Sequence, residues 1–140
     1  KDHPNIMGIK EASGNMSYTA KIAKYAGPNF ALYCGNDDIA VPTMALGGSG
    51  VISVSANIIP KQTHDMIMDY LSGSTAKATE AQIKYLDFIN ALFCEVNPVP
   101  VKEAMNMLGM NVGGFRLPLC EMEESNRSKL KKTMENVGIL

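Results

Sequence analysis

The sequence predicts an α/β fold built on a parallel β-sheet. Its first half alternates short apolar segments, which are typical of strands, with longer segments whose apolar residues recur at helical spacing. Strands that are joined through helices must run parallel, and strands that are apolar throughout indicate a sheet buried on both faces. An open doubly wound sheet and a (β/α)8 barrel both satisfy this pattern, of which the sequence offers three strands.

Strands and helices are expected to alternate up to about residue 71. The predicted strands are 5–10, 30–34 and 51–54, and the predicted helices are 16–26, 37–46 and 58–71. Gly27-Pro28 ends the first helix, and Asp37 or Asp38 is expected to cap the second with a side-chain oxygen. Pro42 fits near the first turn of this second helix, where the N–H that proline lacks would have no partner.

The second half is predicted to be helical. A long helix capped by Ser74 is followed by a short helix that opens near Pro100 and stops at Gly109, and the last helix spans about 123–137. The apolar stripe of the long helix is expected to contain Ile83, Leu86, Ile89, Leu92 and Phe93. We therefore expect two parts, the strands and helices of residues 1–73 and a helical region of residues 74–140.

Composition argues against several classes of partner. The chain has 13 basic and 14 acidic residues with no long run of either sign, so neither a nucleic acid nor a membrane surface is expected to bind it. No apolar stretch approaches the roughly 20 residues of a membrane span, and no secretion signal is visible. The first residue is Lys1 instead of Met, which indicates a truncated start.

Cysteine and histidine are too few and too scattered to indicate a metal or disulfide framework. The three cysteines, Cys34, Cys94 and Cys120, form no CxxC pair, so we expect reduced, buried thiols in a cytoplasmic protein. His3 and His64 are the only histidines, and neither has a paired ligand at helical or strand spacing. No metal is therefore expected, and His64 is expected on a helix surface or at an interface.

Lys10 is the candidate catalytic residue, because it ends the first predicted strand. Alternation puts Lys10 on the face opposite Glu11, and a sheet buried on both faces would direct its amine into packed protein or a pocket mouth. Desolvation favours the neutral amine, which can attack a carbonyl carbon. The alternative is a lysine at a strand end that extends its ammonium group into water.

Five segments carry a resemblance to a known family. They are Gly8-Ile9-Lys10-Glu11-Ala12-Ser13-Gly14, Cys34-Gly35-Asn36-Asp37-Asp38, Gly48-Ser49-Gly50-Val51-Ile52-Ser53-Val54, Asn97-Pro98-Val99-Pro100-Val101-Lys102 and Arg116-Leu117-Pro118-Leu119. In sequence and order they resemble the dihydrodipicolinate synthase family over essentially the whole chain. The resemblance implies the C-terminal portion of a (β/α)8 TIM barrel, with three parallel strands and their helices, followed by a three-helix C-terminal region.

The resemblance also implies a reaction and its residues. Lys10 matches the family lysine that forms a Schiff base with pyruvate, and Gly35 and Ile52 match positions that line the pyruvate site. The expected activity is that of a lyase (a class I aldolase) that condenses pyruvate with aspartate semialdehyde in lysine and diaminopimelate biosynthesis. It needs no cofactor beyond the covalent imine with Lys10. A cytoplasmic homotetramer is implied.

Part of the expected machinery is not in this sequence. In the family, hydroxyl groups that relay protons and an arginine that binds the second carboxylate come from earlier barrel strands, so the missing N-terminal barrel half is an expected partner. Tyr33 matches no relay position and is expected in the core. This chain alone is therefore not expected to catalyse the reaction.

Two alternatives remain open at this point. One is a sister Schiff-base enzyme of the same family, such as N-acetylneuraminate lyase or a keto-deoxy-sugar aldolase. The other is a non-catalytic half-barrel that acts as an interaction module through its unpaired sheet edges.

Overall fold

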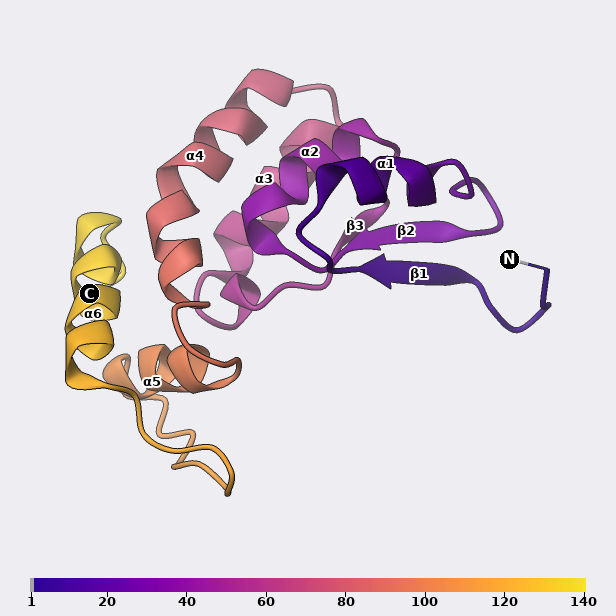
Figure 1. Ribbon diagram of the computed structural model, residues 1–140. Helices are drawn as coiled ribbons and strands as arrows, with labels where there is room; N and C mark the ends of the chain where they lie inside the picture. The colour runs from indigo at the N-terminus through magenta and orange to yellow at the C-terminus, as the bar shows by residue number, and fades with distance from the viewer. Residues whose placement is uncertain (1) are drawn as a thin grey trace.

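The computed structural model describes residues 2–140 and has a three-stranded parallel sheet in the order β1-β2-β3 (Figure 1). Lys1, where the first predicted part begins, lies outside the described residues. The strands are β1 (Gly8–Glu11), β2 (Ala31–Cys34) and β3 (Gly50–Val51). In the register of the sheet, Lys10 pairs with Tyr33 and Tyr33 pairs with Gly50. The predicted parallel α/β arrangement is confirmed.

Helical segments connect the strands and follow them. They are α1 (Met16–Ala23), the 3-10 turn η1 (Asp37–Ile39) with α2 (Ala40–Ala45), the 3-10 turn η2 (Ser55–Asn57) and α3 (Pro60–Leu71). Asn15 caps α1, because its Oδ1 accepts the N–H of Tyr18 at 3.1 Å. Pro60 opens α3 in a position where a helix needs no N–H donor.

Two details of the predicted strand region are wrong. The carboxylate of Asp37 does not cap the following helix, because its Oδ2 accepts the N–H groups of Val54 and Ser55. Asp38 makes no side-chain cap either. The third strand ends at Val51 instead of Val54, because these same contacts with Asp37 draw the chain into the turn η2.

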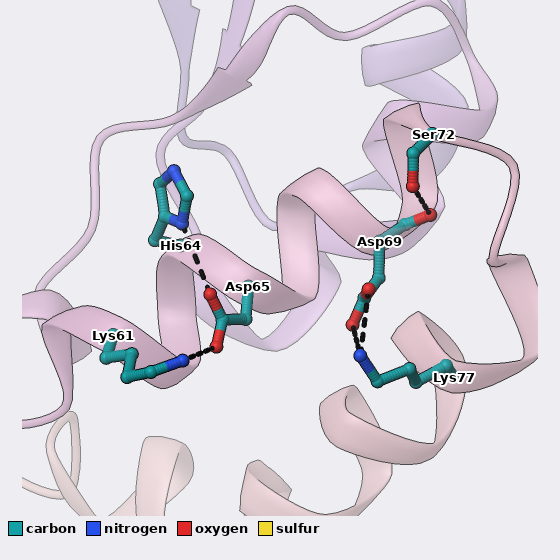
Figure 2. A network of polar contacts seen from close by, with 6 residues as sticks. All are labelled: Lys61, His64, Asp65, Asp69, Ser72 and Lys77. Atoms are coloured by element: carbon teal, nitrogen blue, oxygen red, sulfur yellow. Dashed lines mark hydrogen bonds and ion pairs between the residues drawn. The ribbon is translucent and has the colours of Figure 1, made fainter.

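Three helices form the second half, as predicted. They are α4 (Thr75–Ala91), α5 (Val99–Met107) and α6 (Glu124–Asn136). Helix α6 packs against both α4 and α5, and α4 packs along α3 (Figure 1). On the surface, Lys77 of α4 forms an ion pair with Asp69 of α3 (2.9 Å), which adds a polar tie between these helices (Figure 2). Gly109 and Gly138 follow the last two helices with φ of 76° and 74°, a conformation that glycine adopts without strain.

Apolar side chains gather in two clusters. The first joins Ile58 and Ile59 to the tail helices through Phe88, Leu92 and Leu130. The second lies between the sheet and the helices α2, α3 and α4, and it contains Cys34, Val41, Met44, Met66, Ile67 and Ala78. Ser74 precedes α4 but makes no side-chain cap hydrogen bond. The predicted stripe of α4 is partly wrong, since Ile83 and Phe93 are exposed while Phe88 and Ala91 are buried.

Among residues 2–140, helices cover one face of the sheet and leave the other uncovered. Leu32, Cys34 and Glu11 are buried on that face, whereas Lys10 and Tyr33 on the other face are exposed. The prediction of a sheet buried on both faces is therefore wrong for these residues alone. Tyr33 was predicted to lie in the core. This prediction is wrong for the same reason, because Tyr33 projects from the uncovered face and is 38% exposed.

Candidate active site

Lys10, Gly35 and Ile52 lie next to one another at the carboxyl ends of the three strands. The N–H of Gly35 donates to the carbonyl oxygen of Glu11 at 2.7 Å, and the N–H of Ile52 donates to that of Cys34 at 2.8 Å. These two bonds continue the sheet ladder by one residue past β2 and β3. The three residues that the sequence singled out are thus brought to one edge, at the end of a parallel sheet where substrates usually bind.

Gly35 has no room for a side chain. A Cβ at this position would lie 2.7 Å from Cε of Lys10, 2.5 Å from Cβ of Ala12 and 3.0 Å from the carbonyl oxygen of Glu11. Carbon atoms pack best at about 3.5–4.0 Å, so a methyl group here would overlap the lysine side chain. The absence of a side chain at Gly35 therefore leaves the space in which the end of the Lys10 chain lies.

Lys10 is exposed among residues 2–140, and Ile52 is 47% exposed. Alternation along the strands and the sheet register place Lys10, Tyr33 and Ile52 on the same uncovered face. Lys10 was expected to point into packed protein or a pocket mouth, and residues 2–140 alone do not surround it with packed protein. The side chains that would exclude water from its amine must come from outside them.

Glu11 projects from the opposite face, as predicted, and is buried under α1. Its Oε2 accepts the hydroxyl of Thr19 at 2.5 Å, and its Oε1 accepts the N–H of Ser13 at 2.7 Å. Burial alone would raise the pKa of Glu11, but the hydrogen bonds from Ser13 and Thr19 outweigh it and lower the pKa below its ordinary value. The carboxylate therefore stays ionised and ties the loop after β1 to α1.

Cys34 precedes Gly35 and is a buried thiol. Burial raises the pKa of Cys34, and the nearby charges of Asp37 and Asp38 raise it further against the hydrogen bonds that it forms. The thiol donates to the carbonyl oxygen of Asn36 at 3.1 Å and accepts the hydroxyl of Thr43 at 3.3 Å. Cys34 is therefore a neutral core residue behind the site and not a nucleophile in it.

Two polar residues behind the site were not predicted correctly from the sequence. The contacts of Asp37 were not expected, and Gln82 was not singled out. Asp37 was expected to cap a helix. Gln82 lies on a helix with many polar residues, so its own sequence gives no reason to expect that it is buried. Both are nine-tenths or more buried. The Oδ1 atoms of Asn36 and Asp37 are also buried, and neither has a hydrogen-bond partner among residues 2–140. Contacts between residues 45 positions apart leave no local pattern that could have indicated this arrangement.

Histidine, cysteine and acidic side chains elsewhere in the described part of the chain are scattered. Among residues 2–140, no group of three or more His, Cys, Asp or Glu side chains is arranged to hold a metal ion. His64 lies exposed on α3, where its Nδ1 is 3.3 Å from Oδ1 of Asp65 (Figure 2). The three cysteines are free, and Cys120 is exposed, contrary to the expectation of buried thiols. In the described part of the chain, no helix is both long enough and apolar enough to cross a membrane.

A cavity of about 720 Å³ lies away from Lys10, between α5, α6 and the loop that joins them. Its lining is polar and includes Glu103, Asn106 and Arg127, with Arg127 and Glu103 joined by an ion pair of 2.6 Å. Neither Lys10 nor Gly35 nor Ile52 borders it. The candidate chemistry therefore belongs to the open strand ends and not to this cavity.

Comparison with solved structures identifies the architecture. The dihydrodipicolinate synthase of Cyanidioschyzon merolae, solved with lysine bound, superposes with a TM-score of 0.92 at 39% identity, over 98% of this chain and 46% of that one. The chloride-inhibited enzyme of Acinetobacter baumannii in complex with pyruvate gives 0.93 at 35% identity, over 99% of this chain and 48% of that one. The fold and site thus define the chain as part of a (β/α)8-barrel protein, and the predicted barrel portion is confirmed.

The sequence comparison leads to the family itself. The 4-hydroxy-tetrahydrodipicolinate synthase of Caldicellulosiruptor saccharolyticus is 56% identical over 136 residues, which are 97% of this chain and 46% of the relative. The chain belongs to the dihydrodipicolinate synthetase family, whose model matches residues 1–137. Members of this family are lyases that use a Schiff-base lysine and no cofactor. The chain spans about half the length of the curated relatives that it matches.

Proposed function

We propose that Lys10 is the imine-forming lysine of a class I aldolase that condenses pyruvate with aspartate semialdehyde to 4-hydroxy-tetrahydrodipicolinate. The observation that carries the proposal is the close approach of Lys10 to Gly35 at the carboxyl ends of the strands, in a chain of this family. A relative of the same fold has been solved with pyruvate, and curated relatives are named as this synthase. These names favour the synthase over a sugar aldolase.

The proposed chemistry begins at the exposed Lys10. The neutral amine of Lys10 adds to the keto carbon of pyruvate, and loss of water leaves a protonated imine. The imine withdraws electrons, so a methyl proton can leave and an enamine forms. The enamine carbon then bonds to the aldehyde carbon of aspartate semialdehyde, and ring closure by the amine of that substrate releases Lys10. No electron donor or acceptor is consumed, so no redox cofactor is needed.

Gly35 and Ile52 are proposed to bind pyruvate on either side of the new bond. Because Gly35 lacks a side chain, the end of the Lys10 chain can lie against its backbone, beside the place proposed for the keto acid. Ile52 offers an apolar surface on the same face of the sheet, which helps to exclude water from the imine. In this proposal β1 carries the nucleophile, and the residues after β2 and β3 shape the pocket.

The chain is proposed to work only as the C-terminal part of a complete barrel. Its sheet has two open edges and an uncovered face that bears the exposed Lys10. An N-terminal half would cover this face and supply the proton relay and the group that binds the second carboxylate. In this proposal residues 1–73 complete the barrel, residues 74–140 form the helical region, and the whole protein acts in the cytoplasm as a homotetramer.

Borohydride trapping with pyruvate tests the proposal. Reduction of the imine fixes the pyruvyl group on the lysine, and intact mass followed by peptide mapping locates it. The samples are this chain alone and the complete barrel, in which residues 1–140 are joined to or mixed with an N-terminal half. Lys10→Ala is the test variant, and Lys21→Ala on the exposed surface of α1 is the matched control.

An adduct confined to Lys10, retained in Lys21→Ala and lost in Lys10→Ala, is the expected result. Turnover with aspartate semialdehyde, and none with sugar aldehydes, would then identify the acceptor and exclude the sister aldolases. A folded complete barrel that traps no pyruvate would refute the proposal and favour the non-catalytic interaction module.

A further inference from the structure

The buried carboxylate of Asp37 joins the segments that follow β2 and β3. Its side chain is 1% exposed, and its Oδ2 accepts the N–H of Val54 at 2.8 Å and that of Ser55 at 3.0 Å. The other oxygen, Oδ1, has no hydrogen-bond partner among residues 2–140. A buried charge is costly, and two N–H donors offset only part of that cost. Hydrogen bonds are directional, so Asp37 fixes the position of the segment after β3 relative to the segment after β2. An apolar contact has no direction and would leave this position free.

Gln82 holds the same segment from the tail. It lies on α4 with 6% exposure, and its Nε2 donates to the carbonyl oxygen of Asp37 at 2.9 Å. Its Oε1 accepts the N–H of Val41 at 3.0 Å. One side-chain amide thus binds both ends of the turn between β2 and α2. These contacts connect α4, in the helical tail, with the segment that follows the end of β2.

The two residues bind the segments that carry Gly35 and Ile52. Asp37 follows Gly35 by two positions, and the N–H groups that it binds follow Ile52 by two and three positions. Gly35 and Ile52 are in turn hydrogen-bonded to β1 and β2 through Glu11 and Cys34. Hydrogen bonds therefore connect α4 to Asp37 and Asp37 to Val54 and Ser55, and the backbone links these residues to Gly35 and Ile52 over two or three positions.

We propose that Asp37 and Gln82 are positioning residues of the pyruvate site, through which helix α4 holds Gly35 and Ile52 in place beside Lys10. This inference rests on the proposed function, because it takes Lys10 as the imine-forming residue. Neither residue needs to touch the substrate. Their role is to fix the distance between the two pocket segments, so that pyruvate meets a preformed site.

Kinetics of the complete barrel test this inference. Gln82→Met keeps a similar volume and removes both hydrogen bonds, whereas Gln82→Glu keeps the acceptor for Val41 and loses the donor to Asp37. We expect the pyruvate concentration for half-maximal trapping at Lys10 to rise at least about tenfold in Gln82→Met, because two buried hydrogen bonds are lost and each is worth up to about tenfold. Glu80→Gln, an exposed position on the same helix, is the control and should leave it unchanged.

Asp37 variants supply a conservative rescue. Asp37→Asn keeps one oxygen that can accept both N–H groups, whereas Asp37→Leu keeps none. We expect the asparagine variant to bind pyruvate closer to wild type than the leucine variant does. Hydrogen exchange adds a direct readout, since the amides of Val54 and Ser55 should exchange faster in Asp37→Leu and in both Gln82 variants.

The outcomes separate this inference from the proposed function. A wild-type barrel that traps no pyruvate refutes the proposed function and the inference with it. A wild type that traps pyruvate, with folded Gln82 variants that need the same pyruvate concentration, overturns the positioning role alone. Lower thermal stability without a change in pyruvate dependence also overturns it, because the role is then only structural. If Gln82→Met does not fold, Gln82→Glu decides by the same two measurements.

Discussion

Gly35→Ala should disable the candidate site while leaving most of the fold intact. The added methyl group would lie 2.5 Å from Cβ of Ala12 and 2.7 Å from Cε of Lys10. Both contacts are about 1 Å shorter than the optimal carbon–carbon separation. The flexible chain of Lys10 can move away, but Cβ of Ala12 is attached to the backbone, so the loop after β1 must shift as well. The reactive lysine is thus displaced in either case.

The size of the effect follows from that overlap. Overpacking of this kind lowers the free energy of unfolding by about 1–3 kcal/mol, which a stable barrel tolerates. A displacement of about 1 Å at a reacting group costs about 100-fold in rate. We therefore expect the complete barrel with Gly35→Ala to form the pyruvyl adduct at Lys10 about 100-fold more slowly than wild type.

The assay compares the rate of borohydride-trapped adduct, read by intact mass, with the free energy of unfolding from urea titration. Gly27→Ala is the matched control, because a Cβ at Gly27 meets no atom within 4 Å. It should leave both quantities near those of wild type. A folded Gly35→Ala variant that forms the adduct at the wild-type rate would show that the close approach of Gly35 and Lys10 has no part in the chemistry.

Three further predictions concern stability and reactivity. Hydrogen bonds lower the pKa of the buried Glu11 below its ordinary 4.5. The stability that they add is therefore complete above about pH 4.5 and is lost as the pH falls through the lower pKa of the folded state. Urea titrations from neutral to acid pH should show this loss of stability in wild type and not in Glu11→Gln. Leu130→Ala, at a fully buried position, should lower the free energy of unfolding by about 2–5 kcal/mol, whereas Ile83→Ala at an exposed position should change it little, and equal effects would contradict the packing described. A thiol reagent followed by mass mapping should label the exposed Cys120 first and the buried Cys34 last, since burial raises the pKa of Cys34, and rapid labelling of Cys34 would contradict its place in the core.

Elements with strong local signals could be predicted from the sequence. The helices predicted at 16–26 and 58–71 follow from the helical spacing of their apolar residues, and α1 and α3 lie within a few residues of these bounds. The positions of Gly109 and Gly138 marked the ends of the last two helices, because a positive φ is easy only for glycine. Local chemistry was sufficient at these points, since neighbouring residues satisfy the backbone groups involved.

Contacts between distant segments account for what was predicted wrongly. Asp37 has a second use for its carboxylate in the N–H groups of Val54 and Ser55, and these win over the local helix cap. Helix α4 buries Phe88 and Ala91 instead of Ile83, because it packs against both α3 and α6 and its buried face is set by two partners. A stripe drawn for one partner therefore fails at Ile83, in the middle of the helix.

The exposure of Lys10 has a consequence for how the site is divided. A lysine attacks a carbonyl well only when its amine is shielded from water, since desolvation favours the neutral form. This chain supplies the position of Lys10 through β1 and the room for its side chain through Gly35, but residues 2–140 leave Lys10, Tyr33 and Ile52 on an uncovered face. We therefore infer that geometry and shielding come from different parts of the barrel. Pairing with an N-terminal half would then activate the lysine by covering it, without moving the strand ends that hold it in place.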